Sequence, residues 1–246
     1  LERNLILDTY RLTLEESGIQ PQPLRLKIQN DIPLGAGCGS SAAALLAGVA
    51  LADHFGELGL GDAGIVAEAS RREGHPDNVA ACWYGGFTVS TQTSEKHVET
   101  ATFAGDPAWE LILALQPASL ATKEARALLP ETYSRADAVF NIQRSSLLVA
   151  AFAERRLDLL KVATQDVIHQ PYRQKACPLL EQLLPLAAEP EFAAVTLSGA
   201  GPSVLLFSAA STTFLEAETR IRPLVSPDVE LLQLRIASGS TRTLLV

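Results

Sequence analysis

The sequence predicts a protein that mixes α-helices with β-strands and is divided into two domains. Stretches with strand-like alternation and stretches with helix-like apolar spacing follow one another along all 246 residues. A chain of this length can form one large domain or two small ones. We place the boundary between Thr93 and Ala108, which gives domains 1–105 and 106–246. No repeat and no linker of disordered composition is present.

The first domain is predicted to contain helices that begin and end at recognisable residues. Apolar residues over 4–16 end at Ser17-Gly18, and a run of small and apolar residues ends at Gly56. Asp62 is expected to cap the next helix. The expected helices are 4–16, 40–55, 62–72 and 79–84, and the expected strands are 24–28 and 87–91.

The second domain is predicted to hold strands and helices in alternation. A Gly-rich turn at residues 198–202 separates two short apolar runs, as in a hairpin. A helix opened by Thr122 must stop before Pro130, because the residue before a proline avoids helical angles. The expected strands are 111–115, 195–197, 204–207 and 229–236, and the other expected helices are 136–153, 157–167, 179–188 and 213–224.

Composition excludes several classes of protein. Twenty Lys and Arg against 28 Asp and Glu give a net charge of −8, which argues against a nucleic-acid partner but not against a phosphate ligand. The three cysteines are too far apart for a disulfide framework or a zinc site, so we expect a reducing cytoplasm. No apolar run is long enough to span a membrane, and residues 1–4 do not resemble a signal peptide.

The strongest single signal is the segment 33–43, which reads PLGAGCGSSAA. Three alternate glycines allow unusual backbone angles and close approach of a ligand. Ser40 and Ser41 then open a helix whose first N–H groups have no internal partner and carry the positive end of the helix dipole. These features describe a phosphate cradle, although a plain helix cap after a flexible loop is the alternative. The spacing fits neither the P-loop nor the dinucleotide fingerprint G-x-G-x-x-G.

A second polar cluster combines Glu68 with the segment 73–78, EGHPDN. Mg²⁺ prefers a few hard oxygen ligands and water, so one carboxylate and one serine hydroxyl from the first loop would be sufficient to hold it. The alternative is a solvated helix end followed by an Asp-Asn turn. Three further segments have both a functional and a purely structural interpretation. The structural alternative is a helix cap with a surface arginine for 122–126, a surface turn for 169–173, and a tight connection between strands for 198–203.

In combination these segments resemble the GHMP small-molecule kinases. Residues 33–43 are similar to the superfamily motif P-x-x-x-G-x-G-S-S-A-A, and residues 198–203 to its C-terminal Gly-rich motif. The homoserine kinase branch is resembled by residues 73–79 followed by 84–87, and by residues 122–126, 133–141 and 166–173. The resemblance implies a two-domain α+β fold, with a ribosomal protein S5 domain 2-like N-terminal domain, a ferredoxin-like C-terminal domain and the active site in the cleft between them.

The resemblance further implies ATP-dependent phosphorylation of the side-chain hydroxyl of L-homoserine, a step of threonine biosynthesis, with ATP and Mg²⁺ as cofactors. Ser40 and Glu68 would hold Mg²⁺, with Ser41 and Glu73 as the alternatives. Catalytic positions would be Asp77, Asn78, Arg126 and Arg173, with no proton transfer assigned to Asp77. Nucleotide-binding positions would be Asn4, Pro33, Leu34, Gly35, Ala36, Gly37, Cys38, Gly39, Ser40 and Ser41. Substrate-binding positions would be His75, Asn78, Thr122, Arg126, Arg173, Gly199, Ala200 and Gly201.

The sequence contains no methionine, and it departs from the family pattern in three ways. It begins after the family's first motif, A-x-A-N-x-G-x-G-x-D. Cys38 replaces a commoner Leu and Ala81 stands where Pro is usual, and we expect both to be tolerated. The alternatives are a GHMP kinase for a mevalonate-type or sugar substrate, a nucleotide-binding relative without catalysis, and a purely structural domain. A homodimer is compatible with the sequence, which does not give the oligomeric state.

Overall fold

The computed structural model describes residues 4–116 and 127–243, and this part of the chain separates into two compact units. Unit 1 contains Gly39–Thr102 together with the described residues up to Ile32 and from Ala237 onward. Unit 2 contains the loop Pro33–Cys38 and the described residues between Phe103 and Ile236. Each unit is therefore assembled from segments that are not contiguous in the sequence. A single domain boundary does not describe this division.

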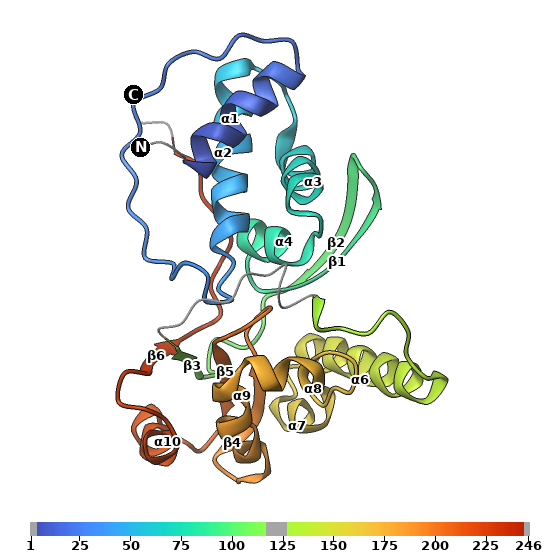
Figure 1. The fold of residues 1–246 in the computed structure, drawn as a ribbon, viewed down its shortest axis with the longest axis vertical. Helices are drawn as coiled ribbons and strands as arrows, with labels where there is room; N and C mark the ends of the chain where they lie inside the picture. The colour runs from blue at the N-terminus through green and yellow to red at the C-terminus, as the bar shows by residue number, and fades with distance from the viewer. Residues whose placement is uncertain (1–3, 117–126, 244–246) are drawn as a thin grey trace. The chain divides into compact units, whose positions relative to one another are not determined.

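Unit 1 is built around the buried helix α2, with α1 and α3 packed beside it (Figure 1). Small residues let the neighbouring helices approach, and the side chains of Leu45, Val49 and Ile65 fill the interface between α2 and α3. Trp83 closes the same core from α4. The helices are α1 Leu5–Glu16, α2 Ser40–Gly56, α3 Gly61–Glu73 and α4 Asp77–Tyr84, so all four predicted helices are present.

Two helix boundaries have different causes from those expected. Gly56 lies inside α2, where a Cβ would come within 2.3 Å of the Leu14 Cδ2 atom, and the left-handed residue that ends the helix is Glu57 (φ 49°). Glycine is therefore needed at position 56 for the approach of α1 rather than for a turn. Asp62 does not cap α3 but accepts a 2.9 Å hydrogen bond from Arg242.

The strands of unit 1 are β1 Phe87–Ser94 and β2 His97–Phe103, which pair as a two-stranded sheet. Only the first was predicted, and β2 was missed because its polar residues give a weak strand signal. The strand expected at residues 24–28 is absent, and this segment is extended without regular structure. Apolar alternation alone does not make a strand, because its backbone groups need a paired neighbour, and the described residues provide none here.

Unit 2 contains an antiparallel four-stranded sheet in the order β4–β5–β3–β6 (Figure 1). Leu113 of β3 lies between Leu205 of β5 and Leu232 of β6, which fixes the register of the sheet centre. This strand order with helices in the two crossovers is the ferredoxin-like arrangement that the family resemblance implied. The strands are β3 Leu111–Leu115, β4 Phe192–Leu197, β5 Val204–Ser208 and β6 Glu230–Leu234.

Buried apolar side chains of the helices and strands of unit 2 form its main core, which includes Leu180, Leu206 and Ile221.

The helix predicted over 157–167 is wrong in length, because regular structure ends at Ala163. The helix predicted from Thr122 falls largely outside the described residues. The helical segments are α6 Arg135–Ala153, η1 Leu157–Leu159, α7 Leu160–Ala163, α8 Gln170–Arg173, η2 Gln174–Ala176, α9 Pro178–Leu183, η3 Leu184–Ala188, α10 Phe214–Ile221 and η4 Arg222–Leu224. Within residues 4–116 and 127–243, none of the helices has the length and apolar character needed to cross a membrane.

Candidate active site

The Gly-rich loop takes the backbone conformation that its glycines were expected to allow. Gly35, Gly37 and Gly39 have φ values of 67°, 76° and 74°, a region that residues with a side chain seldom adopt. Gly39 is the N-cap of α2, and no side chain caps the helix there. The first N–H groups of a 17-residue helix are thus left for another acceptor, which favours the phosphate cradle over a plain capped helix.

The first Gly-rich loop lies in close contact with the second within unit 2. The Ser198 hydroxyl donates a 3.0 Å hydrogen bond to the carbonyl oxygen of Gly37. A Cβ on Gly37 would stand 2.3 Å from the carbonyl oxygen of Ser198 and 2.8 Å from that of Gly201. The backbones meet too closely for any side chain at position 37, so the structure brings the predicted residues Gly37, Gly199 and Gly201 together.

A chain of polar side chains lies beside the start of α2 within unit 1. The Ser41 hydroxyl donates a 2.7 Å hydrogen bond to the Glu73 carboxylate, whose other oxygen lies 3.9 Å from the His75 ring. His75 in turn contacts the Asp77 carboxylate through Nδ1. Asn78 lies at Gly39, where an added Cβ would be 3.9 Å from the Asn78 Cβ. Five of the predicted positions, together with Glu73, therefore gather at the N-terminus of the helix, namely Gly39, Ser41, His75, Asp77 and Asn78.

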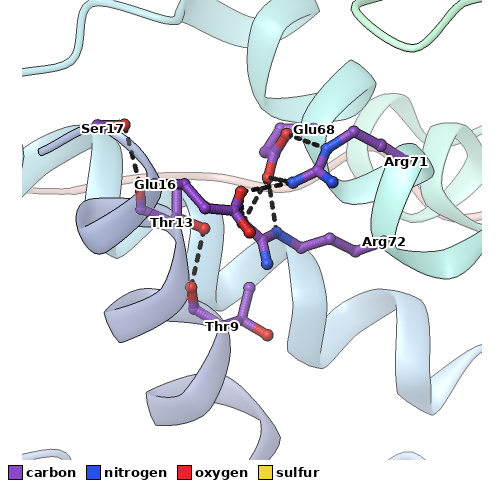
Figure 2. Close-up of polar contacts among 7 residues, drawn as sticks. All are labelled: Thr9, Thr13, Glu16, Ser17, Glu68, Arg71 and Arg72. Carbon is purple, nitrogen blue, oxygen red and sulfur yellow. Dashed lines mark hydrogen bonds and ion pairs between the residues drawn. The ribbon is translucent and has the colours of Figure 1, made fainter.

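Glu68, the metal ligand first inferred from the sequence, is occupied elsewhere (Figure 2). It accepts hydrogen bonds from Arg71 (2.8 and 2.9 Å) and Arg72 (2.6 Å), and both arginines also contact Glu16 of α1. These contacts tie α3 to α1. Of the two pairs that the sequence left open, the contacts favour Ser41 with Glu73 over Ser40 with Glu68, because a carboxylate already paired with two guanidinium groups is a poor cation ligand.

The arginines also change the ionisation of Glu68. Burial raises the pKa of its carboxyl, but hydrogen bonds and charge from Arg71 and Arg72 outweigh burial, so the net pKa is lowered. A carboxyl whose pKa is lower in the folded state stabilises the fold above its unfolded pKa and loses this effect as the pH falls through the folded pKa.

We therefore expect Glu68→Gln to lower the free energy of unfolding at pH 7, with a deficit that shrinks as the pH falls from about 5 toward 3. Urea unfolding of both proteins at several pH values measures this. A deficit that stays constant over the same range would contradict the ionic role of Glu68.

Arg173 is almost fully buried in unit 2, where it is 4% exposed. It donates to the ring nitrogen of His169 and, at 3.5 Å, to the carbonyl oxygen of Gly199 in the second Gly-rich turn. Arg173 and Gly199, which were expected on the substrate side, are therefore neighbours.

No role was predicted from the sequence for Asn141 and Asp166, which shape the turn that carries His169 and Arg173. Asp166 accepts hydrogen bonds from the backbone N–H groups of residues 168–170 and from the Asn141 amide at 2.6 Å. Asn141 also accepts from the N–H of Val167 at 3.0 Å. The two side chains thus stop the preceding helix early and shape the turn before α8, which explains the wrong length predicted for it. Both residues lie in segments that carry the family resemblance, and this was the available signal.

The remaining predicted positions have varied placements. The Asn4 side chain caps α1 by accepting from the N–H groups of Ile6 and Leu7 at 3.0 and 3.2 Å. Thr122 and Arg126 lie outside the described residues. The remaining predicted positions belong to the two Gly-rich segments, namely Pro33, Leu34, Ala36, Cys38 and Ala200. The Cys38 thiol lies 3.6 Å from the Ala36 carbonyl oxygen, a contact within the first loop that does not change the prediction for either residue.

Comparison with known proteins shows the family of the chain. Residues 4–86 match the N-terminal domain of the GHMP kinases. The chain is 43% identical over 204 residues to a homoserine kinase of Solibacter usitatus, which covers 83% of this chain and 67% of that one. It is 40% identical over 208 residues to a homoserine kinase of Deinococcus radiodurans, covering 84% and 67%. The chain thus spans about two thirds of the length of these relatives.

Solved structures show the same relationship. A Listeria monocytogenes structure assigned to homoserine kinase is 28% identical, with a TM-score of 0.78 over 97% of this chain and 78% of that one. The homoserine kinase of Cytophaga hutchinsonii shares the fold with a TM-score of 0.76. The chain therefore belongs to the GHMP kinases, which are ATP-using phosphotransferases. Within them it falls in the homoserine kinase branch.

Proposed function

We propose that the chain catalyses ATP-dependent phosphorylation of the side-chain hydroxyl of L-homoserine, which yields O-phospho-L-homoserine. The observation that carries this proposal is the position of Glu73, His75 and Asn78. These residues belong to the segment 73–78, which resembles the homoserine kinase branch, and they lie beside the start of α2. The relatives at 43% and 40% identity are named homoserine kinases, which supports the same reaction for this chain.

The nucleotide phosphates would be held by the Gly-rich loop and the free N–H groups at the start of α2. Ser41 and Glu73 would bind Mg²⁺, which supplies charge neutralisation to the transferred phosphoryl group. Their oxygens fit this role because they are hard donors already in contact, and because Mg²⁺ takes its remaining ligands from phosphates and water. The described residues contain no larger cluster of His, Cys, Asp and Glu that would form a complete protein cage.

The substrate's carboxylate would be bound by Arg173, with Arg126 as its second cation. A guanidinium group suits a carboxylate because it donates two parallel hydrogen bonds, and its charge persists despite burial. Thr122, His75 and the turn Gly199–Gly201 would complete the binding of the amino acid.

Phosphoryl transfer through a loose transition state depends on alignment and charge neutralisation more than on proton removal. We therefore assign the helix start and the arginines to positioning and assign no general base. A reducing cytoplasm is the compartment we propose, because all three cysteines are free thiols.

The test is a coupled ADP-release assay of the full-length protein with a panel of alcohols. We expect turnover with L-homoserine and little with mevalonate or galactose. Arg173→Ala should raise the KM for homoserine by about 10²-fold, because it removes a charged hydrogen bond of roughly 2–3 kcal/mol, while the KM for ATP changes little. Preferred turnover of mevalonate or a sugar would replace this substrate assignment, and no turnover of any alcohol would favour a nucleotide-binding relative without catalysis.

A further inference from the structure

The buried Arg173 has a titratable neighbour, His169, for which no role was predicted from the sequence although it lies in the segment 166–173. His169 lies one helical turn before Arg173, at the N-cap of α8, and its Nε2 atom contacts the Nη1 atom of the guanidinium group. An arginine only donates hydrogen bonds, so the imidazole must accept here and must be neutral. Protonation of Nε2 would remove the acceptor and place two positive charges in contact.

The fold holds His169 in this position from both sides. Asp166 accepts a 3.0 Å hydrogen bond from the N–H of His169, and the Tyr133 hydroxyl donates a 2.9 Å hydrogen bond to the carbonyl oxygen of Ile168. On α8 the next side chain, Gln170, is buried and accepts a 2.8 Å hydrogen bond from the N–H of Leu197 in β4. These contacts fix the backbone around His169, from which the imidazole extends to Arg173.

The charges around His169 act in opposite directions. Burial lowers the pKa of the imidazole most, the positive charge of Arg173 lowers it further, and the negative charge of Asp166 raises it by less. Among the described residues, the Tyr133 hydroxyl and the Asn141 amide are two further polar groups at this turn, and both are uncharged. The net pKa of His169 is lowered, so the neutral form that can accept from Arg173 persists at neutral pH.

We propose that His169 is a positioning residue for Arg173, and that protonation of its imidazole weakens the binding of the carboxylate-bearing substrate. This inference rests on the proposed function in so far as Arg173 binds that carboxylate. The mechanism is local, because the neutral imidazole fixes one guanidinium nitrogen and so sets the direction of the remaining N–H donors.

The kinetic test measures kcat/KM for homoserine at saturating ATP between pH 5 and pH 8 in the full-length protein. We expect the wild-type value to fall toward pH 5, with a midpoint below that of a free histidine because burial and Arg173 lower the pKa of His169. His169→Gln retains an acceptor that does not titrate, so its value should be near wild type at pH 7.5 and flat with pH. His169→Ala should be several-fold lower and also flat.

Two kinetic outcomes would overturn the proposal. One is an unchanged acid fall in His169→Gln, and the other is a wild-type kcat/KM in His169→Ala at pH 7.5. If His169→Ala does not fold, as judged by thermal unfolding, the comparison between wild type and His169→Gln is decisive by itself.

A second measurement needs no substrate and separates this proposal from the proposed function. An NMR titration of the His169 ring should give a pKa below about 6.5 in the wild type. Arg173→Met should raise this pKa, whereas Arg220→Gln on the remote helix α10 should leave it unchanged. A raised value in Arg173→Met, together with no homoserine turnover by the wild-type protein, would refute the function and retain the contact. An unchanged value, or a wild-type pKa at or above 6.5, would refute the contact.

Discussion

Replacing Glu73 by Gln is expected to reduce kcat by roughly 10²- to 10³-fold, or about 3–4 kcal/mol in the activation free energy. Glutamine keeps the size of the side chain and can still accept the 2.7 Å hydrogen bond from Ser41. It lacks the negative charge with which Glu73 would bind Mg²⁺ in the proposed function. Steady-state kinetics over a range of Mg²⁺ concentrations measure the effect, and the Mg²⁺ requirement should rise together with the loss in kcat.

Glu68→Gln is the matched control, because both carboxylates belong to α3 and both substitutions remove one charge. Glu68 stabilises the contact between α3 and α1 through Arg71 and Arg72, so this variant should lose stability and keep most of its turnover. The reverse result, in which Glu68→Gln loses turnover and Glu73→Gln does not, would restore the metal ligand first inferred from the sequence and refute the role of Glu73.

Gly37→Ala is expected to destabilise the protein by about 2–5 kcal/mol and to weaken ATP binding strongly. The positive φ of 76° costs an alanine about 1–2 kcal/mol. The added Cβ would also stand 2.3 Å from the backbone carbonyl oxygen of Ser198, and such overpacking costs typically 1–3 kcal/mol. Because neither backbone can move aside like a flexible side chain, the loop that approaches the phosphates must shift. Urea unfolding and titration with ATP measure the two effects.

Gly18→Ala separates the conformational cost from the contact. Gly18 has nearly the same φ, 75°, and an added Cβ would meet nothing within 4 Å. Its substitution should therefore cost only the first 1–2 kcal/mol and leave ATP binding intact. Equal destabilisation in the two variants would show that the backbone contact between Gly37 and Ser198 is not formed in solution.

Local signals were sufficient to predict the helices of unit 1 and the strands of unit 2. The small residues over 40–55 and the Gly-rich turn at 198–202 define their elements without help from distant parts of the chain. Prediction was wrong where a tertiary contact decides the structure. Residues 24–28 alternate as a strand does but have no paired neighbour among the described residues, and residues 157–167 end their helix early because Asn141 accepts the Val167 N–H.

The candidate site shows the same distinction. The glycines and serines of the first loop were recognisable because they follow one another in sequence. The choice between Glu68 and Glu73 could not be predicted from the sequence. It depends on which carboxylate of α3 contacts Ser41 and which pairs with the arginines that also contact Glu16. His169 was missed for a related reason, since its importance comes from contact with one buried arginine and not from any spacing.

The discontinuous make-up of the two units limits how the protein can be dissected. A gene fragment that begins at Phe103 would lack the loop Pro33–Cys38, which belongs to unit 2, and would carry the segment from Ala237 onward, which belongs to unit 1. A fragment that ends at Thr102 would lack Arg242, whose guanidinium group pairs with Asp62. A single protease cut near residue 102 would therefore give two fragments that each contain parts of both units, so neither unit can be excised as one piece.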